Sequence, residues 1–167
     1  MVSEQNLLLD EVEVKQKIKR IAYEILERNI QEKEIVFAGI FDKGYEFAEI
    51  LINEFNSICE LKTSLVKVTL DKLAPLQSEI SLDVDLSQLQ NKTIILTDDV
   101  LNTGRTLAYS LKPFLNCEIK KLETAVIVDR GHKSFPISAD YIGYSLSTSL
   151  KEHIQVELGD KIGVYIS

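Results

Sequence analysis

The chain has 167 residues, of which 45% are hydrophobic and 27% are charged, and its formal net charge at pH 7 is −7. These proportions are ordinary for a globular protein, and the length suits a single domain over residues 1–167 with a buried core. No stretch approaches the roughly 20 apolar residues of a membrane-spanning helix, and the acidic total disfavours strong nucleic-acid binding. Cys59 and Cys117 have no metal or redox spacing, which is typical of buried, reduced thiols in a cytoplasmic protein.

Helical and strand patterns alternate in the first part of the chain. Apolar residues recur at helical spacing from Glu11 to Asn29, which predicts a helix. The short apolar run from Ile35 to Ile40 is typical of a buried strand, and Lys43-Gly44 ends it before a second helical pattern over residues 45–55. Residues 65–70 alternate like a further strand.

Residues 71–92 are polar and contain a proline, which predicts a loop or mobile arm. The elements predicted after this arm are strands at residues 94–97 and 124–128, a helix over 107–115 between them, and strand-like pieces at 153–158 and 162–166. The last two pieces are expected to flank or cap a sheet. His153 begins the first of them and is expected at the surface.

Strands that alternate with helices predict an α/β protein with a parallel sheet. In such sheets, ligands bind beyond the carboxyl ends of the strands. Three polar turns follow predicted strands, at residues 42–44, 98–106 and 129–131. The topology therefore predicts that these turns lie at one edge and form one site.

Residues 93–107 are the most informative segment. An apolar strand runs into two adjacent carboxylates, Asp98 and Asp99, and the turn Thr103-Gly104-Arg105-Thr106 then opens a helix. The N–H groups at a helix start favour an anion, a glycine lets the backbone approach closely, and hydroxyl groups donate hydrogen bonds. The two carboxylates can accept hydrogen bonds from a ribose diol. The segment predicts one site for a sugar diol and a phosphate.

Simpler interpretations of the acidic pair exist. Two aspartates after a strand can start a turn, cap a helix or bind a divalent ion. The whole combination of apolar run, two acids, three spacers, Thr-Gly, one residue, Thr and a helix is much more specific. It favours the phosphosugar interpretation.

This segment resembles the phosphoribosyl-pyrophosphate (PRPP) motif of type I phosphoribosyltransferases. Residues 125–143, which include Asp129-Arg130-Gly131-His132, resemble the corresponding region of the bifunctional pyrimidine operon attenuators with uracil phosphoribosyltransferase activity. Further similar segments are residues 20–29, 39–44, 148–149 and 156–158. The resemblance covers nearly the whole chain and is weakest over residues 71–92.

The resemblance implies a central parallel sheet flanked by helices, with a small hood. It implies transfer of a phosphoribosyl group from PRPP to a pyrimidine base, so that uracil and PRPP give UMP and pyrophosphate with Mg²⁺. Asp98 and Asp99 would then be catalytic and would contact the metal directly or through water. The turn from Thr103 through Gly104 and Arg105 to Thr106 would bind the phosphate of PRPP. A homo-oligomer, dimer or higher, is also implied.

Two other groups of site residues follow from the resemblance. The expected pyrophosphate loop is Asp42, Lys43 and Gly44. Without the resemblance, this loop is more simply a strand-to-helix turn with a surface lysine. The expected base hood comprises Asp129, Arg130, Asp140, Tyr141 and Ile142.

The chain departs from the family pattern after Val68-Thr69-Leu70. The family usually has an aromatic-Arg-acid-acid string there, followed by a long polar arm, whereas this chain reads Asp71-Lys72-Leu73-Ala74-Pro75. A lid that excludes water and supplies a cation contributes much of the rate in such chemistry. The change motivates an alternative: a catalytically weak regulator that senses UMP or UTP, binds RNA and attenuates transcription of pyrimidine genes.

The charge distribution does not favour RNA binding, because phosphate neutralisation supplies most of such affinity. The first helix has five cations, namely Lys15, Lys17, Lys19, Arg20 and Arg28. The rest of the chain is acidic, and the hood has Lys133 and Ser138 where more arginine is expected.

Overall fold

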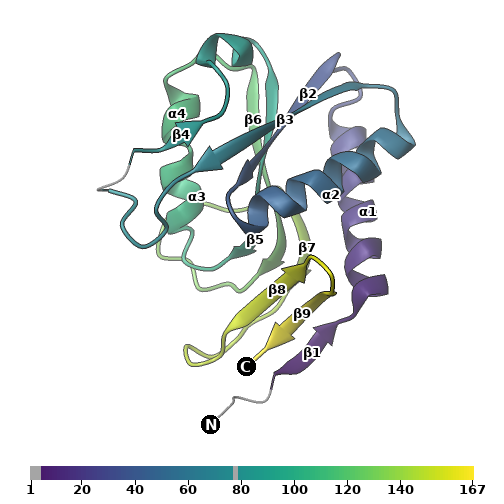
Figure 1. Ribbon diagram of the computed structural model, residues 1–167, viewed down its shortest axis with the longest axis vertical. Helices are drawn as coiled ribbons and strands as arrows, with labels where there is room; N and C mark the ends of the chain where they lie inside the picture. The colour runs from purple at the N-terminus through teal and green to yellow at the C-terminus, as the bar shows by residue number, and fades with distance from the viewer. Residues whose placement is uncertain (1–4, 77–78) are drawn as a thin grey trace.

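The computed structural model describes residues 5–76 and 79–167, so residues 77–78 of the expected arm lie outside the described part. The main sheet has six strands in the order β4-β3-β2-β5-β6-β7 (Figure 1). Their bounds are β2 Glu34–Ile40, β3 Lys62–Thr69, β4 Ser81–Leu82, β5 Thr93–Leu101, β6 Lys121–Asp129 and β7 Tyr141–Ser145. All neighbouring strands are parallel except β4, which pairs antiparallel with β3. The predicted α/β architecture is confirmed.

Helices cover both faces of this sheet (Figure 1). Helix α1 (Glu11–Arg28) begins at a capping box, in which Asp10 accepts from the Glu13 amide and Glu13 accepts from the Asp10 amide, both at 2.9 Å. Helices α1 and α2 (Lys43–Ile58) bury their apolar stripes on one face, and the short helices α3 (Arg105–Ser110) and α4 (Lys112–Leu115) cover the other.

The alternation of strand side chains divides the core into two clusters. In β2, Ile35 and Phe37 face α1 and α2, while Val36 and Ala38 belong to the cluster beneath α3 and α4. Successive side chains of a strand point to opposite faces, so a continuous apolar run such as β2 suits a strand covered on both sides. This is why the short apolar runs of the sequence became the central strands.

A second, antiparallel sheet of three strands lies beside the main one (Figure 1). Its strands are β1 (Asn6–Leu9), β9 (Ile162–Ile166) and β8 (Ile154–Leu158), in that order. The two strand-like pieces of the tail are therefore confirmed. Their partner β1 was not predicted from the sequence, because four residues are too few for a clear alternation.

Several boundaries differ from the predicted ones. Strand β5 continues through residues 98–101, because Asp98 pairs with Val126 and Val100 with Val128 of β6. The acidic pair therefore lies within a strand and not after it. The arm contains β4 and the 3-10 helix η1 (Leu86–Leu89). The single helix predicted over residues 107–115 is divided in two before Pro113, whose missing N–H and ring disfavour the helix interior.

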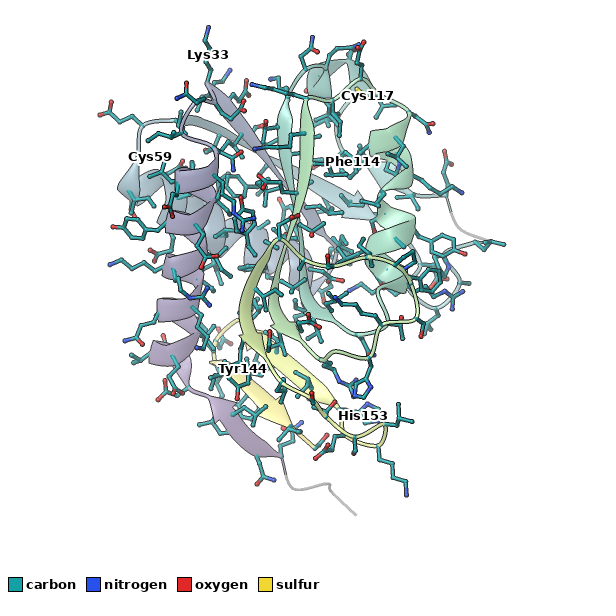
Figure 2. The ribbon with its side chains drawn as sticks, turned by 180° about the vertical axis from the view of Figure 1, so that it is seen from behind. Lys33, Cys59, Phe114, Cys117, Tyr144 and His153 are labelled. Atoms are coloured by element: carbon teal, nitrogen blue, oxygen red, sulfur yellow. The ribbon has the colours of Figure 1, made fainter. Side chains whose placement is uncertain are left out.

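Cys59 and Cys117 are free, half-buried thiols in separate parts of the molecule, and His153 is exposed (Figure 2). In the described part of the chain, no helix has both the length and the apolar character needed to span a membrane.

Candidate phosphosugar site

The carboxyl ends of the parallel strands bring four connecting segments to one edge of the main sheet. They follow β2, β3, β5 and β6, as expected for a parallel sheet. A cavity of about 140 Å³ at this edge is lined by Lys72, Asp98 and every residue from Val100 to Leu107. Larger hollows of about 480 and 430 Å³ lie beside β4 and η1, but they contain none of the turns singled out in the sequence.

The Asp98 carboxyl is the most perturbed acid of this edge. Its residue is only 3% exposed, and Oδ1 accepts a hydrogen bond from the Asp99 amide at 3.0 Å. Burial, and then the neighbouring Asp99 carboxylate, raise the pKa of Asp98 to about 8, against the opposing effect of the Lys72 ammonium. The surroundings of this carboxyl therefore disfavour its charged form.

Lys72 is a site residue that sequence reasoning missed. Its Nζ lies 3.3 Å from Asp98 Oδ1 and lines the same cavity. The Asp71 carboxylate accepts from the amides of Leu73 and Ala74, which bends the chain just after β3. The signal available in the sequence was the position of a lysine directly after a predicted parallel strand.

The turn after β5 is tied to the connection between β6 and β7, residues 130–140, which we call the hood segment. The Thr103 carbonyl accepts from the amides of Ser134 and Phe135 at 2.8 and 3.1 Å, and Thr103 Oγ1 accepts from the Arg105 amide at 3.2 Å. Gly104 has a φ of +85°, and a Cβ there would lie 2.5 Å from Ile137 Cγ2. Left-handed backbone and packing against Ile137 therefore require the glycine, in addition to any approach of a ligand.

The expected pyrophosphate loop packs directly against the acidic strand. A Cβ on Gly44 would lie 2.6 Å from the Thr97 carbonyl oxygen, and the Thr97 hydroxyl donates to the Gly44 carbonyl at 2.7 Å. The peptide bond before Asp42 is cis. Close contact between the loop and β5 places Lys43 and the Asp98 backbone at neighbouring positions of the same edge.

The Lys43 ammonium is held by two carboxylates. It lies 3.2 Å from Glu157 Oε2 of β8 and 3.7 Å from Glu46 Oε2. Burial alone would lower the pKa of Lys43, but the hydrogen bond to Glu157 and the charges of Glu46 and Glu157 raise it overall. The second sheet therefore contributes a side chain to this edge.

Two of the five hood residues lie at the edge. Asp129 ends β6, and its Oδ1 accepts from the Gly131 amide at 2.8 Å. Arg130 follows and is 7% exposed, with Thr148 and Asn102 among its hydrogen-bond partners.

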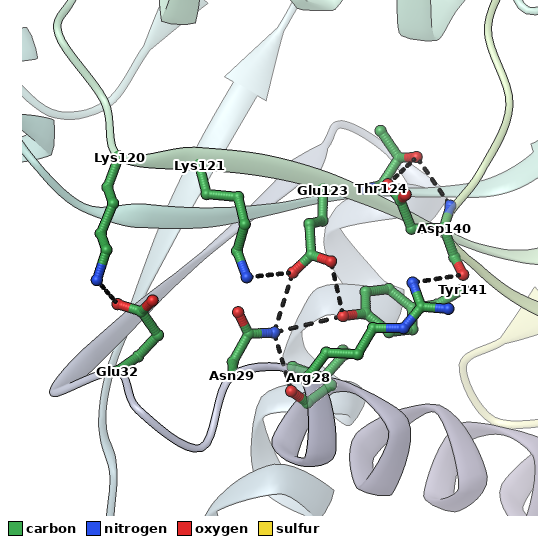
Figure 3. Close-up of polar contacts among 10 residues, drawn as sticks. Arg28, Asn29, Glu32, Lys120, Lys121, Glu123, Thr124, Asp140 and Tyr141 are labelled. Atoms are coloured by element: carbon green, nitrogen blue, oxygen red, sulfur yellow. Dashed lines mark hydrogen bonds and ion pairs between the residues drawn. The ribbon is translucent and has the colours of Figure 1, made fainter.

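The structure does not bring Asp140, Tyr141 and Ile142 to the cavity. Tyr141 begins β7, roughly 13 Å from its carboxyl end at about 3.3 Å per residue. Its hydroxyl donates to Glu123 at 2.9 Å, and Asp140 accepts from the Thr124 amide at 2.8 Å (Figure 3). These residues, assigned to the hood by resemblance, stabilise the opposite half of the sheet.

The Tyr141 hydroxyl belongs to a buried polar network. The Asn29 amide group donates to Glu123 at 3.0 Å and to the tyrosine oxygen at 3.3 Å (Figure 3). Burial, followed by the Glu123 charge, raises the pKa of Tyr141. The phenol is therefore a buried hydrogen-bond donor that joins α1 to the sheet.

Comparison with known proteins agrees with this geometry. The sequence matches the family described as phosphoribosyl transferase domain over residues 4–161. The chain belongs to the type I phosphoribosyltransferase family. A relative named "Bifunctional protein PyrR" from Clostridium novyi is 38% identical and covers 93% of this chain and 92% of its own length. One of the same name from Staphylococcus epidermidis is 34% identical, with 97% and 98% covered.

Solved phosphoribosyltransferases share the fold. The hypoxanthine phosphoribosyltransferase of Trypanosoma cruzi superposes with a TM-score of 0.78 at 17% identity, over 95% of each chain. A hypoxanthine-guanine phosphoribosyltransferase from Bacillus anthracis gives 0.71 at 20% identity, over 86% of this chain and 85% of its own. At these identities the likeness concerns the fold alone. It confirms the phosphoribosyltransferase fold expected from the sequence.

Proposed function

We propose that this phosphoribosyltransferase transfers the phosphoribosyl group of PRPP to uracil and releases pyrophosphate. The observation that carries the proposal is the cavity at the carboxyl edge, where the Asp98 carboxyl and the turn of residues 102–106 line one space. Relatives that share the name PyrR over most of the chain support a pyrimidine substrate.

The reaction is a displacement at the anomeric carbon of the ribose. A ring nitrogen of the base forms a bond to this carbon while the bond to pyrophosphate breaks. Pyrophosphate leaves with the electron pair, and the proton of the attacking nitrogen is lost to solvent. Positive charge develops on the sugar ring, as in glycoside cleavage. Asp98, which lines the cavity, accepts hydrogen bonds from the ribose diol and stabilises that charge as a preorganised carboxyl group, whereas Asp99 does not line the cavity.

The other two anionic groups of PRPP are assigned to separate segments. The hydroxyl groups of Thr103 and Thr106 and the first amides of α3 bind the 5′-phosphate. Lys72, whose ammonium group lies 3.3 Å from Asp98, and Lys43, which belongs to the loop packed against β5, bind the leaving pyrophosphate. Both cations have carboxylate partners in the absence of substrate, so pyrophosphate replaces those partners when it binds.

The donor set at the edge fits Mg²⁺. This ion prefers oxygen ligands and is usually bound by one or two carboxylates together with substrate phosphates and water. Asp99 is half-buried next to the buried Asp98, so Asp99 would hold the ion, directly or through water. When bound, Mg²⁺ neutralises the leaving pyrophosphate.

A spectrophotometric assay with PRPP, Mg²⁺ and single nucleobases tests the proposal. Uracil is expected to be consumed much faster than cytosine, hypoxanthine or guanine. Preference for a purine would replace uracil but retain phosphoribosyl transfer. If no base is consumed while PRPP still binds, the enzymatic proposal is wrong.

The changed arm and the bifunctional name of the relatives favour one further function, a UMP- or UTP-sensing RNA-binding regulator with little catalysis. The pairing of cations on α1 with carboxylates argues against RNA binding. Lys15 and Arg20 form ion pairs with Glu11 and Glu24 at 2.5 and 2.6 Å.

A gel shift with a pyrimidine-operon leader RNA over a salt series decides between the two. Binding that depends on the nucleotide and weakens steeply with salt would support the regulator. Absence of binding at low salt would remove it.

A further inference from the structure

Arg130 is a buried cation whose hydrogen-bond acceptors are all uncharged. Its side chain donates four hydrogen bonds: Nε to Thr148 Oγ1 at 3.0 Å, Nη1 to Asn102 Oδ1 at 3.1 Å, and Nη2 to the carbonyls of Ser149 at 3.4 Å and Glu152 at 2.6 Å. Among the described residues, no carboxylate forms an ion pair with this guanidinium group.

These bonds join three segments that are far apart in sequence. The Arg130 amide donates to the Leu101 carbonyl at 3.0 Å, so the end of β6 holds the end of β5 through both backbone and side chain. Asn102, the residue reached by Nη1, is exposed on one side and lines the cavity. The other bonds fix residues 148–152, where His132 Nε2 also contacts the Thr148 carbonyl.

The position of this charge distinguishes a ligand-related role from simple bracing of a loop. Hydrogen bonds from Ser149, and after them the Arg130 charge, lower the pKa of Glu152, but that carboxylate lies at the surface, where solvent screens its interaction with the guanidinium group. Burial of the cation therefore remains unfavourable, because neutral acceptors compensate only part of its lost hydration. One hydrogen bond away lies the turn of residues 102–106, where the proposed function places a phosphate dianion. Binding of that dianion would place further negative charge close to the buried guanidinium group.

We propose that Arg130 is a positioning residue for the phosphate cradle. The hydrogen bond from its forked guanidinium group fixes Asn102 and hence the backbone of the turn, and its positive charge favours binding of the phosphate dianion. This inference rests on the proposed function and differs from the hood role that the family resemblance implied for Arg130, since the guanidinium group is occupied by protein oxygens and is not available to a base.

The test compares ligands with and without a phosphate. Ribose 5-phosphate and UMP are titrated by calorimetry into the wild type, Arg130→Lys, Asn102→Ala and the double variant. Arg130→Lys retains the charge but not the fork, and Asn102→Ala removes the acceptor at an exposed position that tolerates the change. Arg28→Lys is the matched control, because Arg28 contacts Tyr141 and Asp140 in the opposite half of the sheet.

Each single variant is expected to bind both ligands about tenfold more weakly, the change expected for one lost charge-assisted hydrogen bond. The double variant should be no weaker than the weaker single variant, because the two residues act through one contact. The KM for uracil should stay within about twofold of the wild type, and Arg28→Lys should match the wild type throughout.

Three results would overturn the inference. Wild-type affinity for ribose 5-phosphate in folded Asn102→Ala or Arg130→Lys shows that the contact only braces the loop. Equal losses for phosphate ligands and for uracil show a general disturbance. If the wild type binds neither phosphate ligand, the proposed function falls together with this inference, whereas purine specificity alone leaves the inference intact.

Discussion

Asp98, to which the proposed function assigns the ribose diol, carries a cost in stability. Its carboxyl lies in the central strand, and the nearest cation, Lys72 at 3.3 Å, comes from a segment with an exposed side chain. A carboxyl in such surroundings disfavours its own charged form. The charged form of this carboxyl therefore does not stabilise the fold.

Replacement of this carboxyl should change stability in a pH-dependent manner. The pKa of Asp98 is raised from 3.8 to about 8 on folding, so between these values the folded state binds more protons and the free energy of unfolding decreases as pH rises. Asp98→Asn removes this decrease in the free energy of unfolding with rising pH. It should become progressively more stable than the wild type, by on the order of a few kcal/mol at pH 8, while its use of PRPP weakens by about 1.5–3 kcal/mol.

Urea unfolding at pH 5 and pH 8 measures the effect on stability. The exposed Asp160→Asn serves as the control, and its difference from the wild type should be the same at both pH values. A stability difference for Asp98→Asn that does not change with pH would contradict the assignment of a perturbed carboxyl.

At the scale of elements, the β5 turn packs closely against the hood segment. Gly104 and Gly131 both have positive φ, but a Cβ on Gly104 would meet Ile137 at 2.5 Å, whereas one on Gly131 would have no atom within 4 Å. The two glycines therefore form a matched pair that separates backbone strain from packing.

Alanine at each of these positions should destabilise the fold to different extents. Both changes incur about 1–2 kcal/mol for the left-handed conformation, and Gly104→Ala should lose roughly 1–3 kcal/mol more through overpacking against Ile137. Chemical denaturation gives both values. UMP affinity should fall for Gly104→Ala, because the turn must move away from the hood segment. Equal destabilisation by the two changes would mean that the hood segment moves away from the added methyl group at no cost in free energy.

The network that joins α1 to β6 and β7 allows a test of a role in base binding. Tyr141→Phe removes the donor to buried Glu123 and should cost about 1–3 kcal/mol of unfolding free energy. The KM for uracil should not change, since this hydroxyl lies in the other half of the sheet. Tyr144→Phe, a half-buried tyrosine of the same strand, controls for loss of a phenol. A raised KM for uracil in Tyr141→Phe alone would restore Tyr141 to the hood.

At the scale of the whole molecule, the sequence allowed prediction of what depends on local pattern. The apolar runs at residues 35–40, 94–97 and 124–128 became central strands because a parallel strand covered on both faces needs such a run. Strand β7 was missed, since Tyr141 and Ile142 were assigned to the hood by resemblance to the family and not by their own strand pattern.

What the sequence did not predict depends on contacts between distant segments. Lys72 and Asp98 are 26 positions apart, and Lys43 and Glu157 are 114 apart. No local pattern encodes such pairs, because they arise from the order of strands in the sheet. The candidate acids, the phosphate turn and Lys43 could be named in advance, whereas Lys72 and the carboxylate partners of both lysines required the fold.

The carboxylates and the ammonium groups at this edge belong to different kinds of backbone segment. The carboxylates belong to β5, which is paired on both sides, whereas the ammonium groups come from the segment after β3 and from the first turn of α2. Central strands open only with global unfolding, while connecting segments open locally. The carboxylates of β5 should thus keep their positions throughout the catalytic cycle. The segments that carry the two ammonium groups should move when pyrophosphate leaves. Amide hydrogen exchange should be slow at residues 94–98 and fast at residues 71–74, and pyrophosphate should slow exchange in the second group only.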